Sequence, residues 1–188
     1  MSTDEVTIID LDTPIFTLDG PEYIEVDGKQ VPNYDITIPE FGEGDVVSGR
    51  VVRIDKDDNI WVTDKGSDMI IKFNPAGRVQ MVFGRRMEST SPNTKPHPHV
   101  NPPRPAVDGL FREPTDVAWD SDGNIYITDG YINSRVAKYD RNGDWVKQWG
   151  EYGTEPGQFR TPHAIAIDNK NNIYVGDRAN TRVQVFDT

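Results

Sequence analysis

The chain lacks cysteine altogether and has only three histidines among its 188 residues. Without cysteine, disulfide bonds and thiolate chemistry are excluded. No apolar run approaches the roughly 18 residues that a membrane-spanning helix needs, so we expect no membrane span. The first residues, MSTDEVTIIDLDTPIF, have neither the basic nor the apolar region of a secretory signal.

Basic residues are also scarce, because 20 Lys and Arg stand against 31 Asp and Glu and give a net charge of −11. Binding to a phosphate backbone needs clustered Lys and Arg, so we expect no nucleic-acid partner. No stretch of about ten residues carries a convincing helical period, which argues against most α/β enzyme folds.

Three stretches of the chain repeat one another: VVRIDKDDNIWVTDKGSDMIIKFNPAG, DVAWDSDGNIYITDGYINSRVAKYDRNG and AIAIDNKNNIYVGDRANTRVQVFDT. Each contains an Asp, an Asn four residues later and a second Asp nine residues after the first. Turn-forming residues separate runs of β-branched and aromatic residues that are apolar on both faces. Four antiparallel strands recurring about every 40 residues predict an all-β fold of β-propeller blades.

Two other interpretations of these repeats fail. DSDGN and DRNGD resemble the start of an EF-hand calcium loop, but Ile125 and Trp145 stand where that loop needs Gly. The strand aromatics could form a stacking platform for nucleic acid, but in this acidic chain we expect them to pack between blades. These aromatics are Trp61, Trp119, Tyr126 and Tyr174.

The strings PTDVA, DGYINSR, GQFRTPH and DRANTR, in this order, carry a resemblance to a known family. The rhythm of GQFRTPHAIAID is similar to that of NHL-repeat propellers, and the four strings together resemble the peptidyl-α-hydroxyglycine α-amidating lyases. The resemblance covers about residues 50 to 188. It implies a six-bladed ring, of which this chain supplies about three four-stranded blades, with a zinc ion on the axis.

The resemblance implies that histidines at one repeat position in alternate blades bind the zinc. His163 occupies this position in the third repeat, where Thr115 stands in the second and Arg50 in the first. A guanidinium offers no lone pair to a metal, so the chain supplies one of the expected ligands.

The resemblance also implies a reaction, in which a peptide ending in α-hydroxyglycine is cleaved to a peptide amide and glyoxylate. Tyr131 matches the tyrosine proposed as the base, and a phenol needs a nearby cation to act so at neutral pH. Zinc and Arg178 would supply that charge, and Arg178 could also hold the substrate carboxylate. Ile132 replaces the family's cysteine, which indicates a bacterial-type relative.

Plainer interpretations of these residues stay open. A lone histidine at the start of a strand is commonly structural, Tyr131 could cap a blade, and Arg178 could pair with Asp129 or Asp177. His97 and His99 lie in a Pro-rich insertion, 86–112, and are an alternative source of ligands. The competing function is a non-catalytic propeller that binds a peptide or a protein partner.

The organisation that we predict is an N-terminal segment, 1–47, followed by propeller blades over 48–188. The segment is irregular, a degenerate blade, a closing strand or a non-native extension. Within 1–47, VTIID, PIFTL and YDITI are strand candidates. The third repeat ends before a fourth strand, so we expect that blade to lack its outermost strand. The open blade faces would then be apolar and would favour association of two copies into a homodimer.

Overall fold

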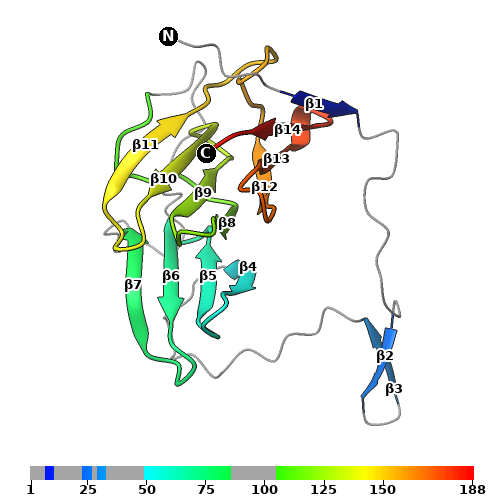
Figure 1. Ribbon diagram of the computed structural model, residues 1–188, viewed down its shortest axis with the longest axis vertical. Coiled ribbons are helices and arrows are strands. Elements are labelled where there is room, and N and C mark those ends of the chain that lie inside the picture. The colour runs from blue at the N-terminus through cyan, green and yellow to red at the C-terminus, as the bar shows by residue number, and fades with distance from the viewer. Residues whose placement is uncertain (1–6, 11–22, 27–28, 33–48, 86–104) are drawn as a thin grey trace.

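The computed structural model describes residues 7–10, 23–26, 29–32, 49–85 and 105–188. These residues form three antiparallel sheets of four strands each and one separate two-stranded hairpin (Figure 1). The helical content of this part of the chain is a single short 3-10 turn, η1. The predicted all-β class with four-stranded blades is therefore confirmed.

Each blade has its strands in chain order across the sheet, apart from the last strand of blade 3. Blade 1 consists of β4 (Gly49–Ile54), β5 (Ile60–Asp64), β6 (Met69–Phe73) and β7 (Val79–Gly84). Blade 2 consists of β8 (Asp116–Trp119), β9 (Ile125–Asp129), β10 (Arg135–Tyr139) and β11 (Trp145–Trp149). Blade 3 consists of β12 (Pro162–Ile167), β13 (Ile173–Asp177) and β14 (Arg182–Phe186), with η1 (Arg178–Asn180) between the last two.

The fourth strand of blade 3 comes from the N-terminal segment. β1 (Thr7–Asp10) pairs antiparallel with β14, joining Thr7 to Val185 and Asp10 to Arg182 (Figure 1). The prediction that this blade lacks its outermost strand is therefore wrong, because a distant segment with a β-branched run takes the free edge of β14.

Of the other strand candidates before residue 48, PIFTL and YDITI lie outside the described residues. The structure instead has a hairpin of β2 (Tyr23–Val26) and β3 (Lys29–Pro32), apart from the blades in Figure 1. Of the Pro-rich insertion, the described residues begin at Pro105, and Phe111 near its end is buried in the core.

Two apolar clusters join the three blades. Between blades 1 and 2, Trp61 packs with Ile70 and Phe83 against Val117 and Ile127. Between blades 2 and 3, the members of the cluster are Ala118, Tyr126, Val136, Phe159, Ile165, Ile173 and Val175. The prediction that the strand aromatics pack between blades is confirmed for Trp61 and Tyr126, which are 2% and 0% exposed.

The first Asp of each repeat closes the turn between the first two strands. In blade 2, Asp120 Oδ1 accepts hydrogen bonds from the backbone N–H groups of Asp122 and Asn124, and Oδ2 accepts from Asn124 Nδ2 and the Tyr126 hydroxyl. Asp55 and Asp168 do the same in blades 1 and 3. These carboxylates therefore form turns, as the sequence predicted.

The second Asp of each repeat lies at the opposite end of the blade and is fully buried. Asp129 accepts hydrogen bonds from the Arg112 N–H and from the side chains of Asn133 and Arg135. Asp177 accepts the equivalent bonds from Arg160, Asn180 and Arg182. In the motifs DGYINSR and DRANTR, the Asp, the Asn and the last Arg therefore form the ends of the blades.

The outer face of blade 1 is buried on its two central strands, β5 and β6, and exposed on its two edge strands. Ile60, Val62, Ile71 and Phe73 form a cluster on the face turned away from blade 2, and their exposed fractions are 8% or less. Ile54, Val79 and Val82 of the edge strands pair with residues of this cluster and are 52%, 52% and 48% exposed. The face is therefore covered only at its centre, and the association of two copies stays a prediction. On blade 3, Ala164 and Ala166 of β12 are exposed and Tyr174 is half-buried, so this face is only partly covered.

Candidate functional site

Three residues that the sequence singled out lie together at the end of the blades where the buried Asp residues are. The Tyr131 hydroxyl lies 3.2 Å from His163 Nε2, and Arg178 Nη1 lies 3.5 Å from the same hydroxyl. The Tyr131 and His163 rings meet edge to face, with their centroids 5.8 Å apart. The phenol oxygen is thus placed between an imidazole and a guanidinium.

The turn after β13 positions Arg178. Its backbone N–H donates to the Thr161 carbonyl at 3.1 Å, and the Ala179 N–H donates to the Arg160 carbonyl at 2.9 Å. These bonds tie η1 to the segment that leads into β12, where His163 is found. Arg178 and His163 are therefore held close to each other by the backbone of a single blade.

The close approach of blades 2 and 3 positions Tyr131. Gly130 precedes it, and a Cβ at Gly130 would overlap the carbonyl oxygen of Pro162. The Thr115 hydroxyl also donates to this carbonyl, at 2.8 Å. Only glycine permits this contact, so the residue before Tyr131 brings its backbone against the residue before His163.

The strand register tests the repeat positions assigned to Arg50 and His163. In β12, Pro162 pairs with Asp177 and Ala164 with Gly176, so that His163 is the extra residue of a bulge. In β4, Gly49 pairs with Asp64 and Val51 with Thr63, which makes Arg50 the extra residue. The two residues therefore occupy the same backbone position in blades 1 and 3, as the sequence predicted.

Two further residues of the cluster, Lys65 and Glu113, were not predicted from the sequence. Lys65 Nζ lies 4.3 Å from the centroid of the Tyr131 ring and 3.0 Å from a carboxylate oxygen of Glu113. Aligning the repeats would have indicated Lys65, because it follows Asp64 as Arg178 follows Asp177. All three blades thus contribute side chains to one cluster.

The cluster is accessible to a ligand. Tyr131 and His163 are half-buried and Arg178 is exposed. The alternative that Arg178 pairs with Asp129 or Asp177 is not what the structure shows, because their ion pairs are with Arg135 and Arg182, each at 3.0 Å. Arg178 instead points its guanidinium at the Tyr131 hydroxyl.

The described part of the chain does not make a zinc site. It contains no group of three His, Cys, Asp or Glu side chains close enough to hold a metal ion. The cluster around Tyr131 offers one imidazole, whereas a catalytic zinc takes three protein ligands. His97 and His99, the alternative ligands, lie outside the described residues.

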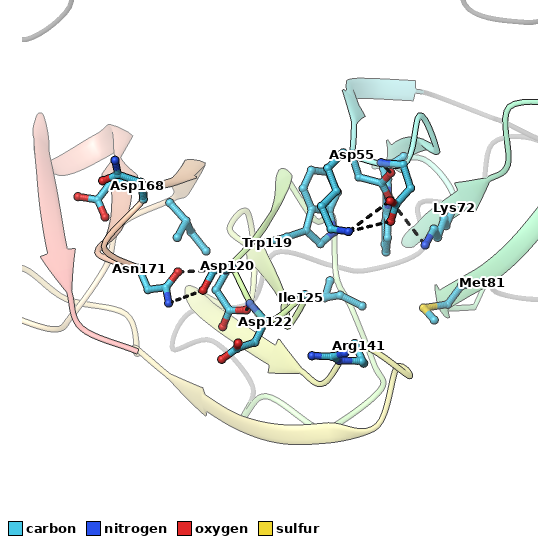
Figure 2. Close-up of a pocket in the computed structure, with 17 residues that line it drawn as sticks. Asp55, Lys72, Met81, Trp119, Asp120, Asp122, Ile125, Arg141, Asp168 and Asn171 are labelled. Carbon is cyan, nitrogen blue, oxygen red and sulfur yellow. Dashed lines mark hydrogen bonds and ion pairs between the residues drawn. The ribbon is translucent and has the colours of Figure 1, made fainter.

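A cavity of about 580 Å³ lies at the opposite end of the blades (Figure 2). Trp61, Trp119, Met81 and Ile125 form its apolar wall, and the turns that begin at Asp55, Asp120 and Asp168 form its rim. These three carboxylates already accept the turn hydrogen bonds, and Ser121 and Asn171 bond across the rim. The cavity contains none of the residues of the Tyr131 cluster.

Burial of Asp55 and Asp120 raises the pKa of each carboxyl, but several hydrogen bonds together outweigh this effect. The donors are the Asn side chain, the aromatic side chain and the turn backbone, and they hold the pKa below its usual value. For Tyr126, burial and the bond to Asp120 raise the pKa of the phenol. The hydrogen bonds of these turns therefore stabilise the charged form of the Asp55 and Asp120 carboxylates.

Comparison with known proteins supports a relationship to amidating enzymes. The NHL repeat family matches residues 111–139 and 159–186. The mouse peptidyl-glycine alpha-amidating monooxygenase is 35% identical over 143 residues, which cover 72% of this chain and 13% of that protein. A probable peptidyl-alpha-hydroxyglycine alpha-amidating lyase of Caenorhabditis elegans is 34% identical over 154 residues, covering 79% of this chain and 39% of the relative.

Among solved structures, a protein of unknown function from Bacteroides thetaiotaomicron superposes with a TM-score of 0.52 at 20% identity. The superposition covers 70% of this chain and 32% of that one, and it supports the fold alone. This chain thus spans well under half of the mouse and nematode relatives. From its repeats, its blades and these relatives, the chain is an NHL-repeat β-propeller that resembles the peptidyl-α-hydroxyglycine α-amidating lyases.

Proposed function

We propose that the Tyr131 cluster is part of the active site of a carbon–nitrogen lyase that acts on peptidyl-α-hydroxyglycine. The observation that carries this proposal is the meeting of Tyr131, His163 and Arg178 within hydrogen-bonding distance. The lyase resemblance pointed to these three residues at separate places in the sequence. A merely structural set would not need a phenol, an imidazole and a guanidinium on an accessible surface.

The chemistry is the breakdown of a carbinolamide. A base removes the proton of the α-hydroxyl group, the carbon–oxygen bond becomes a carbonyl, and the carbon–nitrogen bond breaks with its electron pair on nitrogen. The nitrogen takes up a proton, which gives the peptide amide and glyoxylate. Tyr131 is the base in this proposal, held by His163 and Arg178 so that its oxygen faces the ligand.

The family resemblance also predicts zinc, which would act as a Lewis acid on the hydroxyl oxygen. His163 is the one described residue that would bind it. Because the cluster supplies a single imidazole, we expect the chain by itself to turn over slowly. Zinc binding stays a prediction, and Arg178 is the described cation that faces the Tyr131 hydroxyl.

The test is the release of glyoxylate from N-benzoyl-α-hydroxyglycine, measured for the wild-type chain and for Tyr131→Phe. Release above the spontaneous rate in the wild type, and its loss in the variant, would support the lyase. If the wild type releases none while still binding the non-cleavable N-benzoylglycine, the site belongs to a binding propeller, the competing function.

A further inference from the structure

Two cationic side chains occupy the same repeat position on either side of the Tyr131 cluster. Lys65 directly follows Asp64 at the end of β5, and Arg178 directly follows Asp177 at the end of β13. In the blade between them this position is Gly130, where the Pro162 carbonyl leaves no room for a side chain. The middle blade therefore has no side chain at this position, and the two cations come from the blades on either side of it.

Both cations contact Tyr131. Lys65 Nζ lies over the face of the ring, 4.3 Å from its centroid, and Arg178 Nη1 lies 3.5 Å from the hydroxyl oxygen. The chain as a whole has a net charge of −11, so two cations beside one side chain differ from its overall acidic character. Among the described residues, Lys65 and Arg178 together outnumber the one carboxylate paired with them, that of Glu113, and the remaining positive charge favours an anionic group of the ligand.

Lys65 is held in place by its surroundings. Its turn is fixed by Asp64, which accepts hydrogen bonds from the Gly66 N–H at 3.0 Å and the Ser67 hydroxyl at 2.8 Å. Glu113, which pairs with Lys65, has its own N–H bonded to Asp68 Oδ1 of the same turn at 2.6 Å. The turn that bears Lys65 and the backbone of its ion-pair partner are thus joined to each other.

Lys65 can bind an anion without breaking these contacts. An ammonium group has three N–H donors, and that of Lys65 forms an ion pair with Glu113 and lies over the ring face of Tyr131. The Lys65 side chain is 29% exposed and that of Glu113 is 15% exposed, so the ion pair is partly shielded from water. A charge-assisted hydrogen bond to a carboxylate is stronger in such surroundings than in bulk water.

We propose that Lys65 and Arg178 together form a receptor for the carboxylate of an N-acylglycine-type ligand, one cation on each side of Tyr131. The inference rests on the proposed function, because the substrate of that lyase ends in such a carboxylate. It adds Lys65 as the residue that makes the site select a free carboxylate. Peptides that end in an amide lack this charge and are excluded.

The experiment is isothermal titration calorimetry with N-benzoylglycine, which has the carboxylate but no α-hydroxyl group and cannot be cleaved. The variants are Lys65→Met, which removes the charge, and Lys65→Arg, which keeps it. The matched control is Lys72→Met at the other end of the blade. Lys72 also lies over an aromatic ring, 5.2 Å from the Trp61 centroid, and pairs with Asp55 at 3.6 Å.

We expect Lys65→Met to weaken binding about tenfold or more, as the loss of a hydrogen bond to a charged group does. Lys65→Arg should keep most of the affinity, and Lys72→Met should bind like the wild type. N-benzoylglycinamide, the uncharged analogue, should bind weakly to all four proteins. If Lys65→Met binds as well as the wild type, or the amide binds as well as the acid, the inference is overturned.

This measurement separates the inference from the function on which it rests. Binding that depends on Lys65, without release of glyoxylate from N-benzoyl-α-hydroxyglycine, would keep the carboxylate receptor and remove the lyase. Release of glyoxylate with no dependence of binding or KM on Lys65 would keep the lyase and remove the receptor. A wild-type chain that does not bind N-benzoylglycine at all overturns the inference.

Discussion

The two ends of each blade use the same residue in different ways. At one end, Asp55, Asp120 and Asp168 close turns through bonds to residues no more than six positions away. At the other end, Asp129 is fully buried and bonds Arg112, which is 17 residues away in the sequence. The first kind of Asp builds a local turn, whereas in blades 2 and 3 the second kind also fastens the connection that leads into the blade.

This difference explains where the candidate chemistry is. The residues that follow the buried Asp differ from blade to blade: Lys65 in blade 1, Gly130 and Tyr131 in blade 2, and Arg178 in blade 3. The constant Asp holds the backbone in each case, so the next side chain can vary without loss of the fold. The turn end has the same Asp and Asn in all three blades, and its side chains are occupied with one another.

The largest effect that we predict comes from removing a buried Asp. Asp129→Asn leaves Arg135 buried without its counter-charge, which costs about 3–5 kcal/mol of unfolding free energy. The matched change Asp120→Asn at the turn end keeps one acceptor oxygen and should cost about 1 kcal/mol. Urea unfolding followed by tryptophan fluorescence measures both. Equal losses would show that the two ends do not differ as we describe.

The two tyrosines of blade 2 give a second contrast. Tyr131→Phe should lower kcat by about 100-fold or more, the usual contribution of a general base, and leave the melting temperature nearly unchanged. Tyr126→Phe removes a buried hydroxyl that bonds Asp120 at 2.8 Å, so it should cost about 1 kcal/mol of stability and spare turnover. Glyoxylate release and thermal unfolding would be measured on both variants. A large stability loss in Tyr131→Phe, with residual activity, would favour the blade-capping role.

A third prediction concerns Arg50, which has the backbone position of His163 in the alternate blade. Arg50→His places a second imidazole at this position and removes a charge that repels cations. We expect zinc affinity to rise about tenfold or more, because each added imidazole adds a coordinate bond. Titration against a competing zinc chelator measures the change, with Arg50→Gln as the control for loss of charge. An unchanged affinity would mean that the two positions do not share a metal.

Much of this fold could be predicted from the sequence, because the repeats carry it. The spacing of Asp55, Asn59 and Asp64, repeated in the other two blades, fixes both ends of the first hairpin in each sheet. Strands such as β5 and β9 read as apolar on both faces, and both are fully buried. The pairing of β1 with β14 was not predictable, because no pattern within either segment identifies the strand with which it pairs.

The candidate site was predictable in part. Tyr131, His163 and Arg178 could be named because they stand inside recognisable strings, although no spacing in the sequence shows that they meet. Lys65 and Glu113 stand in no such string, and their pairing depends on how blade 1 docks against blade 2. The two residues are 48 positions apart in the sequence, and local sequence patterns do not indicate contacts over such a separation.

The smallest effect that we predict is the response of the turn end to acid. Hydrogen bonds hold the pKa of Asp55 and Asp120 below the usual value in the folded chain, in spite of burial. Each carboxylate therefore adds stability at pH values above its unfolded pKa, about 3.9, and this stability is lost as the pH falls through the folded pKa. At pH values below about 4, we expect the urea concentration at the unfolding midpoint to decrease modestly. In Asp120→Asn this decrease should be smaller. Asp122→Asn is the control, since it removes a charge from the same turn while its N–H still donates to Asp120. If Asp122→Asn flattens the profile as much as Asp120→Asn, the acid response reflects the overall charge of the turn and not the bonds that Asp120 accepts.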